Sequence, residues 1–155
     1  MALDLLSALP DTAVVLSAHP SDWREAVRLA GDALTRSGST TSDYTGEMLA
    51  AIDELGPYIV IAPGIAIAHS RPSPSVLRSG LSWVRLDEPV EFGHSRNDPV
   101  GLVIGLAARD HADHLEVMSA IAAALADQQA SAALATAASA DTVRDLLASA
   151  TAGQS

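Results

Sequence analysis

The stretch YIVIAPGIAIAHSRPSPS, from Tyr58 to Ser75, joins an apolar run to a polar loop that contains prolines. Its first part is rich in β-branched residues and partly alternates in polarity, which is typical of strands in a buried sheet. His69 stands where the run ends, and Ser70, Arg71 and Pro72 follow at once. An imidazole at the boundary between a buried strand and solvent is well placed to act on another molecule. His69 is therefore the first candidate functional residue.

Helix and strand patterns alternate on both sides of this stretch. A short strand is predicted at residues 12–18, and two more strands are predicted at 79–86 and 99–108. The run PVGLVIGLAA at 99–108 is continuously apolar, as expected for a strand that is covered on both faces. Helices are predicted at residues 20–39, 42–56, 110–127, 129–139 and 140–150. The pattern predicts an α/β fold in three layers, with a mixed, mostly buried sheet and helices on both faces.

Start and stop signals bound the predicted helices. In residues 20–39, Ser21 or Asp22 is the N-cap candidate and Gly38 the stop signal. In residues 110–127, four apolar residues at helical spacing predict the face that packs against the core. They are Leu115, Met118, Ile121 and Leu125.

Length and composition limit the kind of protein. The 155 residues predict one domain, which we place at residues 1–150, with a frayed tail at 151–155. The absence of cysteine excludes disulfides, thiolate metal sites and a cysteine nucleophile within this chain. A net charge of −10 argues against nucleic-acid binding, which depends on cationic side chains. We find no signal peptide and no apolar run of about 18 residues, so we expect a cytoplasmic protein with no direct membrane insertion.

A second histidine occupies a position similar to that of His69. His114 lies in the first turn of the helix that follows the strand in VGLVIGLAARDHADH. Two histidines that each follow an apolar strand could face one cleft. From the pattern alone, two solvent-exposed loop histidines remain an equal alternative.

The segment from Tyr44 to about Leu147 resembles the enzyme IIA domains of the mannitol, fructose and ascorbate class of the bacterial sugar phosphotransferase system. The resemblance rests on GIAIAHS, on Gly80 opening a strand in LRSGLSWVRL, on EPVEFG and NDPVGLVIGLAARD, and on a histidine opening a helix in HLEVMSAIAAAL. The segments GPYIVIAPGIAIAHSRP and FGHSRNDPV are most similar to the ascorbate-type branch of this family.

This resemblance implies a phosphoryl carrier that needs no cofactor and no metal. His69 would accept phosphate from the phosphocarrier histidine protein and pass it to a cysteine on the IIB domain of a sugar permease. His114 would match the family's second histidine and stabilise the phosphoryl oxygens. Arg71, Arg109 and Ser70 lie beside these positions and are candidates for binding phosphate.

The chain departs from the family pattern next to the proposed acceptor. Ala68 stands where the family usually has proline, and Ser70 stands where it has glycine or alanine. Because proline restricts the backbone, its loss is expected to loosen the loop around His69. We also expect a backbone carbonyl in the loop from His69 to Pro72 to hold the proton of the ring nitrogen that does not react.

Two other functions, a regulatory module and a metalloenzyme, are alternatives to phosphoryl transfer in sugar uptake. A regulatory IIA-like module would use the same His69 with a different partner. A metalloenzyme would use His69, His111 and His114 with Asp110 or Asp113 as ligands, but the HExxH pattern is absent.

A serine hydrolase is excluded because no G-x-S-x-G motif occurs. Outside the proposed site, His19 and His94 are interpreted as solvated histidines, and His111 has no clear counterpart in the family.

Overall fold

Five strands form one mixed sheet in this computed structural model, which describes residues 8–152. The strand order is β1-β4-β5-β3-β2. β1 pairs in parallel with β4 and β3 in parallel with β5, whereas β4–β5 and β2–β3 are antiparallel. The mixed sheet predicted from the sequence is therefore confirmed. The strands are β1 Val14–Ala18, β2 Val60–Ala62, β3 Ile65–Ala68, β4 Gly80–Val90 and β5 Val100–Ala107.

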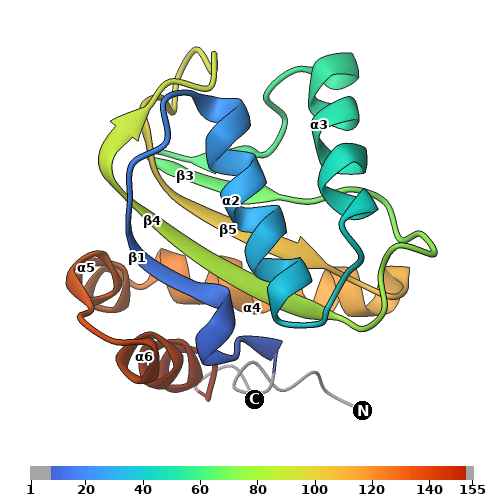
Figure 1. The fold of residues 1–155 in the computed structure, drawn as a ribbon. Coiled ribbons are helices and arrows are strands. Elements are labelled where there is room, and N and C mark those ends of the chain that lie inside the picture. Colours follow the sequence, from blue (N-terminus) through green and yellow to red (C-terminus); the bar gives the residue numbers. More distant parts are fainter. Residues whose placement is uncertain (1–7, 153–155) are drawn as a thin grey trace.

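Helices cover both faces of this sheet (Figure 1). The helices α2 and α3 lie on one face, and α4, α5 and α6 lie on the other (Figure 1). A short 3₁₀ helix, η1, precedes β1. The helical elements are η1 Asp11–Ala13, α2 Trp23–Arg36, α3 Asp43–Leu55, α4 His111–Ala126, α5 Gln128–Thr136 and α6 Ala140–Ala152. None of the helices within residues 8–152 is long and apolar enough to cross a lipid bilayer.

Alternating side chains of the central strands produce the two cores of the domain. Val84 of β4 and Val103 of β5 pack with α2 and α3, whereas Trp83 and Ile104 pack with α4, α5 and α6. All four side chains are completely buried. The continuous apolar run of β5 is thus covered on both faces, as its sequence predicts.

The start and stop signals of α2 operate as expected. The Asp22 carboxylate accepts the Glu25 N–H at 2.9 Å, so Asp22 rather than Ser21 is the N-cap. Gly38 follows the helix with φ of 87°, a conformation that favours glycine.

The apolar stretch around residues 58–70 forms two strands. Gly64, with φ of 77°, allows the chain to turn between β2 and β3. The Gly64 carbonyl also accepts N–H groups of Gly101 and Leu102, which fixes the turn against β5. The hairpin therefore brings β3, and the histidine that follows it, beside the central strand.

The predicted core-facing stripe of α4 is wrong in one position. Val117, Ile121 and Ala124 are buried, whereas Leu115 is 53% exposed. Alanines supply apolar surface on several sides of this helix, so its polarity pattern does not single out one face. The buried stripe runs along the i, i+4, i+7 positions from Val117, and Leu115 lies off it.

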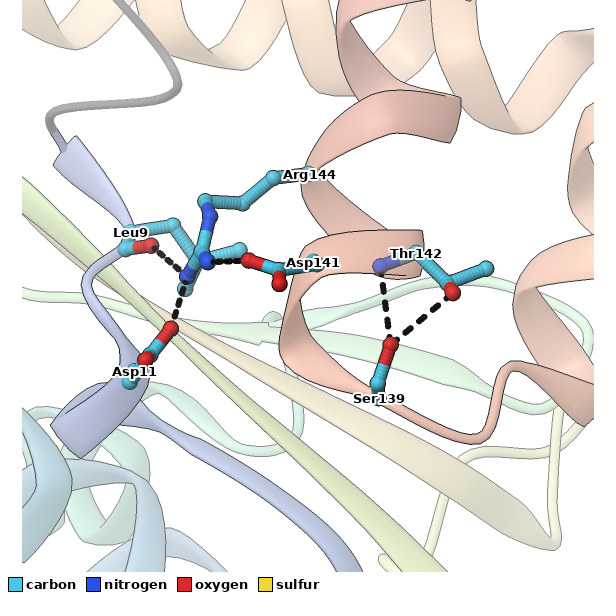
Figure 2. A network of polar contacts seen from close by, with 6 residues as sticks. All are labelled: Leu9, Asp11, Ser139, Asp141, Thr142 and Arg144. Atoms are coloured by element: carbon cyan, nitrogen blue, oxygen red, sulfur yellow. Dashed lines mark hydrogen bonds and ion pairs between the residues drawn. The ribbon is translucent and has the colours of Figure 1, made fainter.

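Arg144 ties helix α6 to the start of the described chain (Figure 2). Its guanidinium donates to the Leu9 carbonyl at 3.2 Å and contacts the carboxylates of Asp11, at 2.6 Å, and Asp141. The Ser139 hydroxyl accepts the N–H of Thr142 at the start of the same helix. Residues 153–155, part of the predicted tail, lie outside the described residues.

Candidate functional site

His69 and His114 meet at one edge of the sheet. His69 directly follows β3, and α4, which carries His114, follows β5 after a short turn. Because β3 and β5 are parallel neighbours, their carboxyl ends lie at the same edge, where α/β sheets commonly bind ligands. The centroids of the two imidazole rings are 5.3 Å apart, with their planes at 54°. The structure thus brings together the two histidines that the sequence singled out.

The register of α4 explains why His114 points toward His69. His114 lies at positions i−3 and i−7 from Val117 and Ile121, so it continues the buried stripe of the helix by one turn. At this turn the stripe faces the cleft, where the ring of His114 lies beside that of His69. The stripe therefore ends in a candidate functional side chain.

Both histidines line a cleft of about 670 Å³. One wall is α3, another is the loop after β3, and the third is the first turn of α4. The lining residues are Glu47, Ala50, Ala51, Glu54, Leu55, Tyr58, His69, Ser70, Arg71, Pro72, Ser73, His111 and His114.

A main-chain contact determines which nitrogen of His69 can react. The Nδ1 atom lies 2.7 Å from the carbonyl oxygen of Ile67. Because a carbonyl can only accept, Nδ1 carries the proton and donates it, and Nε2 keeps a lone pair. We expected this acceptor in the loop from His69 to Pro72, but the Ile67 carbonyl belongs to β3. No hydrogen bond to His69 Nε2 is found within residues 8–152.

Tyr58 positions His69 through both its hydroxyl and its ring. The hydroxyl donates to the His69 carbonyl at 2.6 Å, and the ring meets the imidazole edge-on with centroids 5.2 Å apart. Tyr58 also lines the cleft. It was missed as a site residue because a tyrosine in an apolar run looks like a core residue.

Tyr44 holds the next residue of the loop. Its hydroxyl donates to the Leu106 carbonyl at 2.9 Å and accepts the Ser70 N–H at 3.0 Å. Burial raises the pKa of Tyr44 to about 12, so this hydroxyl stays protonated. The chain has two tyrosines, and both bind the main chain of residues 69–70. That scarcity is the one signal in the sequence that could have identified them.

The surroundings favour neutral imidazoles. Burial lowers the pKa of His69, the Ile67 contact opposes this effect, and the nearby His114 lowers the pKa further. Burial and then the neighbouring His111 lower the pKa of His114. His69 is therefore mostly neutral near pH 7, as a nucleophile must be.

The two candidate arginines have different environments. Arg71 is exposed and lines the cleft, as does Ser70. Arg109 is not among the lining residues, because its Nε points to the Asp113 carboxylate, 3.9 Å away. The main-chain N–H of Arg109 donates to the Ser79 hydroxyl, which in turn donates to the Asp113 carboxylate at 2.6 Å. Arg109 thus contacts the first turn of α4 and lies outside the residues that line the cleft.

Ala68 belongs to β3 and not to the loop. It is completely buried and lies opposite Gly105 of β5. The Ile67 N–H bonds to the Ile59 carbonyl on the β2 side, so the alternation of the strand directs the Ala68 N–H toward β5. The expected loosening of the loop by this alanine does not fit its position, because the sheet fixes the residue.

The remaining histidines have distinct surroundings. His111 lines the cleft, with its ring parallel to that of His114. The Nδ1 atom of His94 accepts the N–H groups of Arg96 and Asn97, so this residue shapes its own loop rather than being merely solvated. His19 contacts Asp87 at 2.8 Å.

The structure does not support the metalloenzyme alternative. Among residues 8–152, no group of three or more histidine, aspartate or glutamate side chains has an arrangement that could hold a metal ion. His69, His111 and His114 share the cleft without forming such a group.

The chain is similar to known proteins over most of its length. Residues 7–150 match the family model described as phosphoenolpyruvate-dependent sugar phosphotransferase system, EIIA 2. The ascorbate-specific PTS system EIIA component of Salmonella typhimurium is 39% identical to this chain over 111 residues, which cover 72% of each protein.

Solved structures agree with this match. A protein described as a PTS IIA, PtxA, from Streptococcus mutans superimposes with a TM-score of 0.86 at 27% identity, covering 97% of this chain and 96% of that one. A chain in the complex of mannitol enzyme IIA and phosphorylated enzyme IIB from Escherichia coli gives a TM-score of 0.79 at 30% identity, covering 90% and 96%. The resemblance inferred from the sequence is thereby confirmed. The chain belongs to the EIIA 2 family of the phosphoenolpyruvate-dependent sugar phosphotransferase system.

Proposed function

We propose that this protein is a phosphoryl carrier in the uptake of an ascorbate-like sugar. His69 Nε2 accepts the phosphoryl group from the phosphocarrier histidine protein and passes it to a cysteine of a IIB domain. One observation carries the proposal: the Ile67 carbonyl holds the Nδ1 proton of His69, while the ring lines a cleft beside His114.

The proposed transfer consists of two displacements at phosphorus. In the first, the lone pair of His69 Nε2 attacks phosphorus, and the donor's ring nitrogen leaves with its electron pair. The Nδ1 proton remains on His69, against the Ile67 carbonyl. In the second, a thiolate of the IIB domain attacks phosphorus, and the Nε2–P bond breaks to regenerate neutral His69. Protonated Nδ1 favours this step because it makes the ring a better leaving group.

His114 is the proposed stabiliser of the phosphoryl oxygens. Its ring is next to His69, and the start of α4 contributes the positive end of a helix dipole. Phosphoryl transfer depends mainly on positioning and on charge stabilisation, which these groups supply. The chemistry calls for no cofactor or metal.

The relatives support the choice of partners. The mannitol enzyme IIA of Escherichia coli is known in complex with phosphorylated enzyme IIB, and the ascorbate-specific component of Salmonella typhimurium is 39% identical to this chain over 111 residues. A regulatory role would use the same histidine and differ only in its partner, and the identity to ascorbate-specific components favours transport. We expect the exchange to take place in the cytoplasm.

Phosphorylation by the general phosphotransferase proteins tests the proposal. With phosphoenolpyruvate, enzyme I and the phosphocarrier histidine protein, the intact mass should rise by one phosphoryl group that is lost in acid and stable in base. The His69→Gln variant should gain none, and His94→Gln is the matched control that should gain one. Phosphorylation of His69→Gln would contradict the assignment. Transfer to ascorbate-type and mannitol-type IIB domains would then identify the partner.

A further inference from the structure

A third histidine lies beside the two that the proposed reaction uses. His111 is the first residue of α4, and its side chain is exposed and lines the same cleft. Its ring is parallel to that of His114, with centroids 6.4 Å apart and 6° between the planes. The three imidazoles therefore form a row from the end of β3, through His114, to the exposed start of α4.

The imidazole of His111 has no other partner in the described structure. Within residues 8–152, no hydrogen bond or ion pair of its side chain is found. By contrast, His94 accepts two N–H groups in its own loop, and His19 contacts Asp87. The ring nitrogens of His111 are thus available to a molecule that enters the cleft.

A phosphoryl group on His69 would change the charge that the other two imidazoles face. In the resting protein, protons on both stacked rings would repel each other, and His111 is one cause of the lowered pKa of His114. A phosphoryl group on His69 Nε2 would oppose this repulsion, because its negatively charged oxygens attract positive charge to the rings beside them.

The other charged groups around the cleft do not cancel this attraction. Glu47 and Glu54 of α3 face the cleft and favour a proton on His111, whereas Arg71 opposes it. On α4 itself, Asp110 accepts the Asp113 N–H, and Asp113 accepts the Ser79 hydroxyl. Both of these carboxylates already have donors, and both favour positive charge nearby.

We propose that His111 is an outer phosphate-binding residue of this site, which takes up a proton from solvent when His69 is phosphorylated and supplies positive charge to the phosphoryl oxygens. The inference rests on the proposed function, because it requires a phosphoryl group on His69. It gives the carrier two histidines that stabilise the phosphorylated state, His114 next to the acceptor and His111 at the exposed side.

Nitrogen NMR of the imidazoles tests this directly. The titration midpoints of all five histidines are measured in the free protein and in the protein kept phosphorylated by phosphoenolpyruvate and trace general phosphotransferase proteins. The His111 midpoint should rise on phosphorylation by about one pH unit, the size expected for a dianion nearby. His19 and His94, which do not line the cleft, are internal controls and should not move.

The outcomes separate the two proposals. A phosphorylated protein in which the His111 midpoint moves no more than that of His94 overturns the role of His111 alone. A protein that gains no phosphoryl mass overturns the proposed function itself.

A kinetic experiment distinguishes charge from structure. Single-turnover phosphorylation of His111→Gln should be about tenfold slower than that of wild type at pH 6.5 and nearly equal at pH 8.5, because fewer protons are available at the higher pH. His19→Gln, an exposed histidine outside the cleft, should match wild type at both values. An unchanged rate, or the same reduction at both pH values, contradicts the proposal.

Discussion

The imidazoles of His69 and His114 lie 5.3 Å apart, although one follows a strand and the other belongs to the first turn of a helix. Their proximity results from the parallel pairing of β3 with β5 and from the register of α4, whose buried stripe ends at His114. A change in either would separate the proposed acceptor from the group that we expect to stabilise its charge.

Replacing His114 should therefore slow transfer without unfolding the protein. We expect His114→Ala to lower the rate of His69 phosphorylation by about ten- to a thousandfold, the range for loss of one charge-stabilising donor. Rapid-quench measurement with the phosphorylated phosphocarrier protein gives the rate. Ser119→Ala, on an exposed part of α4, is the control and should keep the wild-type rate. Equal rates for both variants would remove His114 from the mechanism.

Tyr44→Phe should destabilise the fold and the loop of His69 together. The change leaves the buried Leu106 carbonyl and the part-buried Ser70 N–H without their hydroxyl partner. We expect the free energy of unfolding to fall by about 1–3 kcal/mol, as for a buried polar group left unpaired. Urea denaturation measures it. In the matched variant Tyr58→Phe, water can replace the half-buried hydroxyl, so a loss as large as that of Tyr44→Phe would argue against this explanation.

Stability should decrease in mildly acidic solution. The pKa values of His69 and His114 are lowered in the folded protein from the ordinary value of 6.5. The unfolded chain thus binds protons more readily below pH 6.5, so the stabilisation present above that pH is lost as pH falls through the folded pKa values. Urea denaturation at pH 7.5 and 5.5 measures the decrease.

The double variant His69→Gln, His114→Gln identifies the cause of that decrease. It should lose less stability than wild type over the same pH interval. An identical loss would assign the acid sensitivity to other groups.

Ala68→Pro should weaken the sheet rather than rigidify the site. Proline cannot donate the N–H that Ala68 directs toward β5, and a backbone hydrogen bond contributes about 1 kcal/mol. We expect a lower melting temperature than for wild type by thermal denaturation. Ser70→Gly, in the loop, is the comparison that leaves the strand intact. A rise in melting temperature for Ala68→Pro would mean that β3 ends before Ala68.

Much of the fold could be predicted because it depends on patterns of polarity. The continuity and length of the apolar run in β5 predict a strand covered on both faces, and Gly38 predicts where α2 stops. The hairpin at Gly64 was missed, although the Pro63-Gly64 pair is a turn signal. Leu115 was assigned to the wrong face because alanine provides little contrast between the sides of a helix.

Site residues could be predicted where they lie at the end of a strand or the start of a helix, as His69 and His114 do. They could not be predicted where the partner is a main-chain atom, because every residue has a carbonyl and the sequence does not say which one an imidazole meets. The acceptor on Ile67 and the carbonyl bound by Tyr58 are both of this kind. Tyr58 and Tyr44 could be recognised as site residues only after the chain had brought them to the loop.

Because His69 Nδ1 contacts the main-chain carbonyl of Ile67, side-chain substitutions cannot remove the group that fixes which ring nitrogen is free. Any residue at position 67 that keeps the extended backbone offers the same oxygen, so a scan of side chains would not detect its importance. Only a change in the peptide unit itself, such as an ester in place of the amide after Ile67, would weaken the acceptor. Side chains of the cleft walls can therefore change while the orientation of the proposed nucleophile, which depends on the path of the main chain, stays the same.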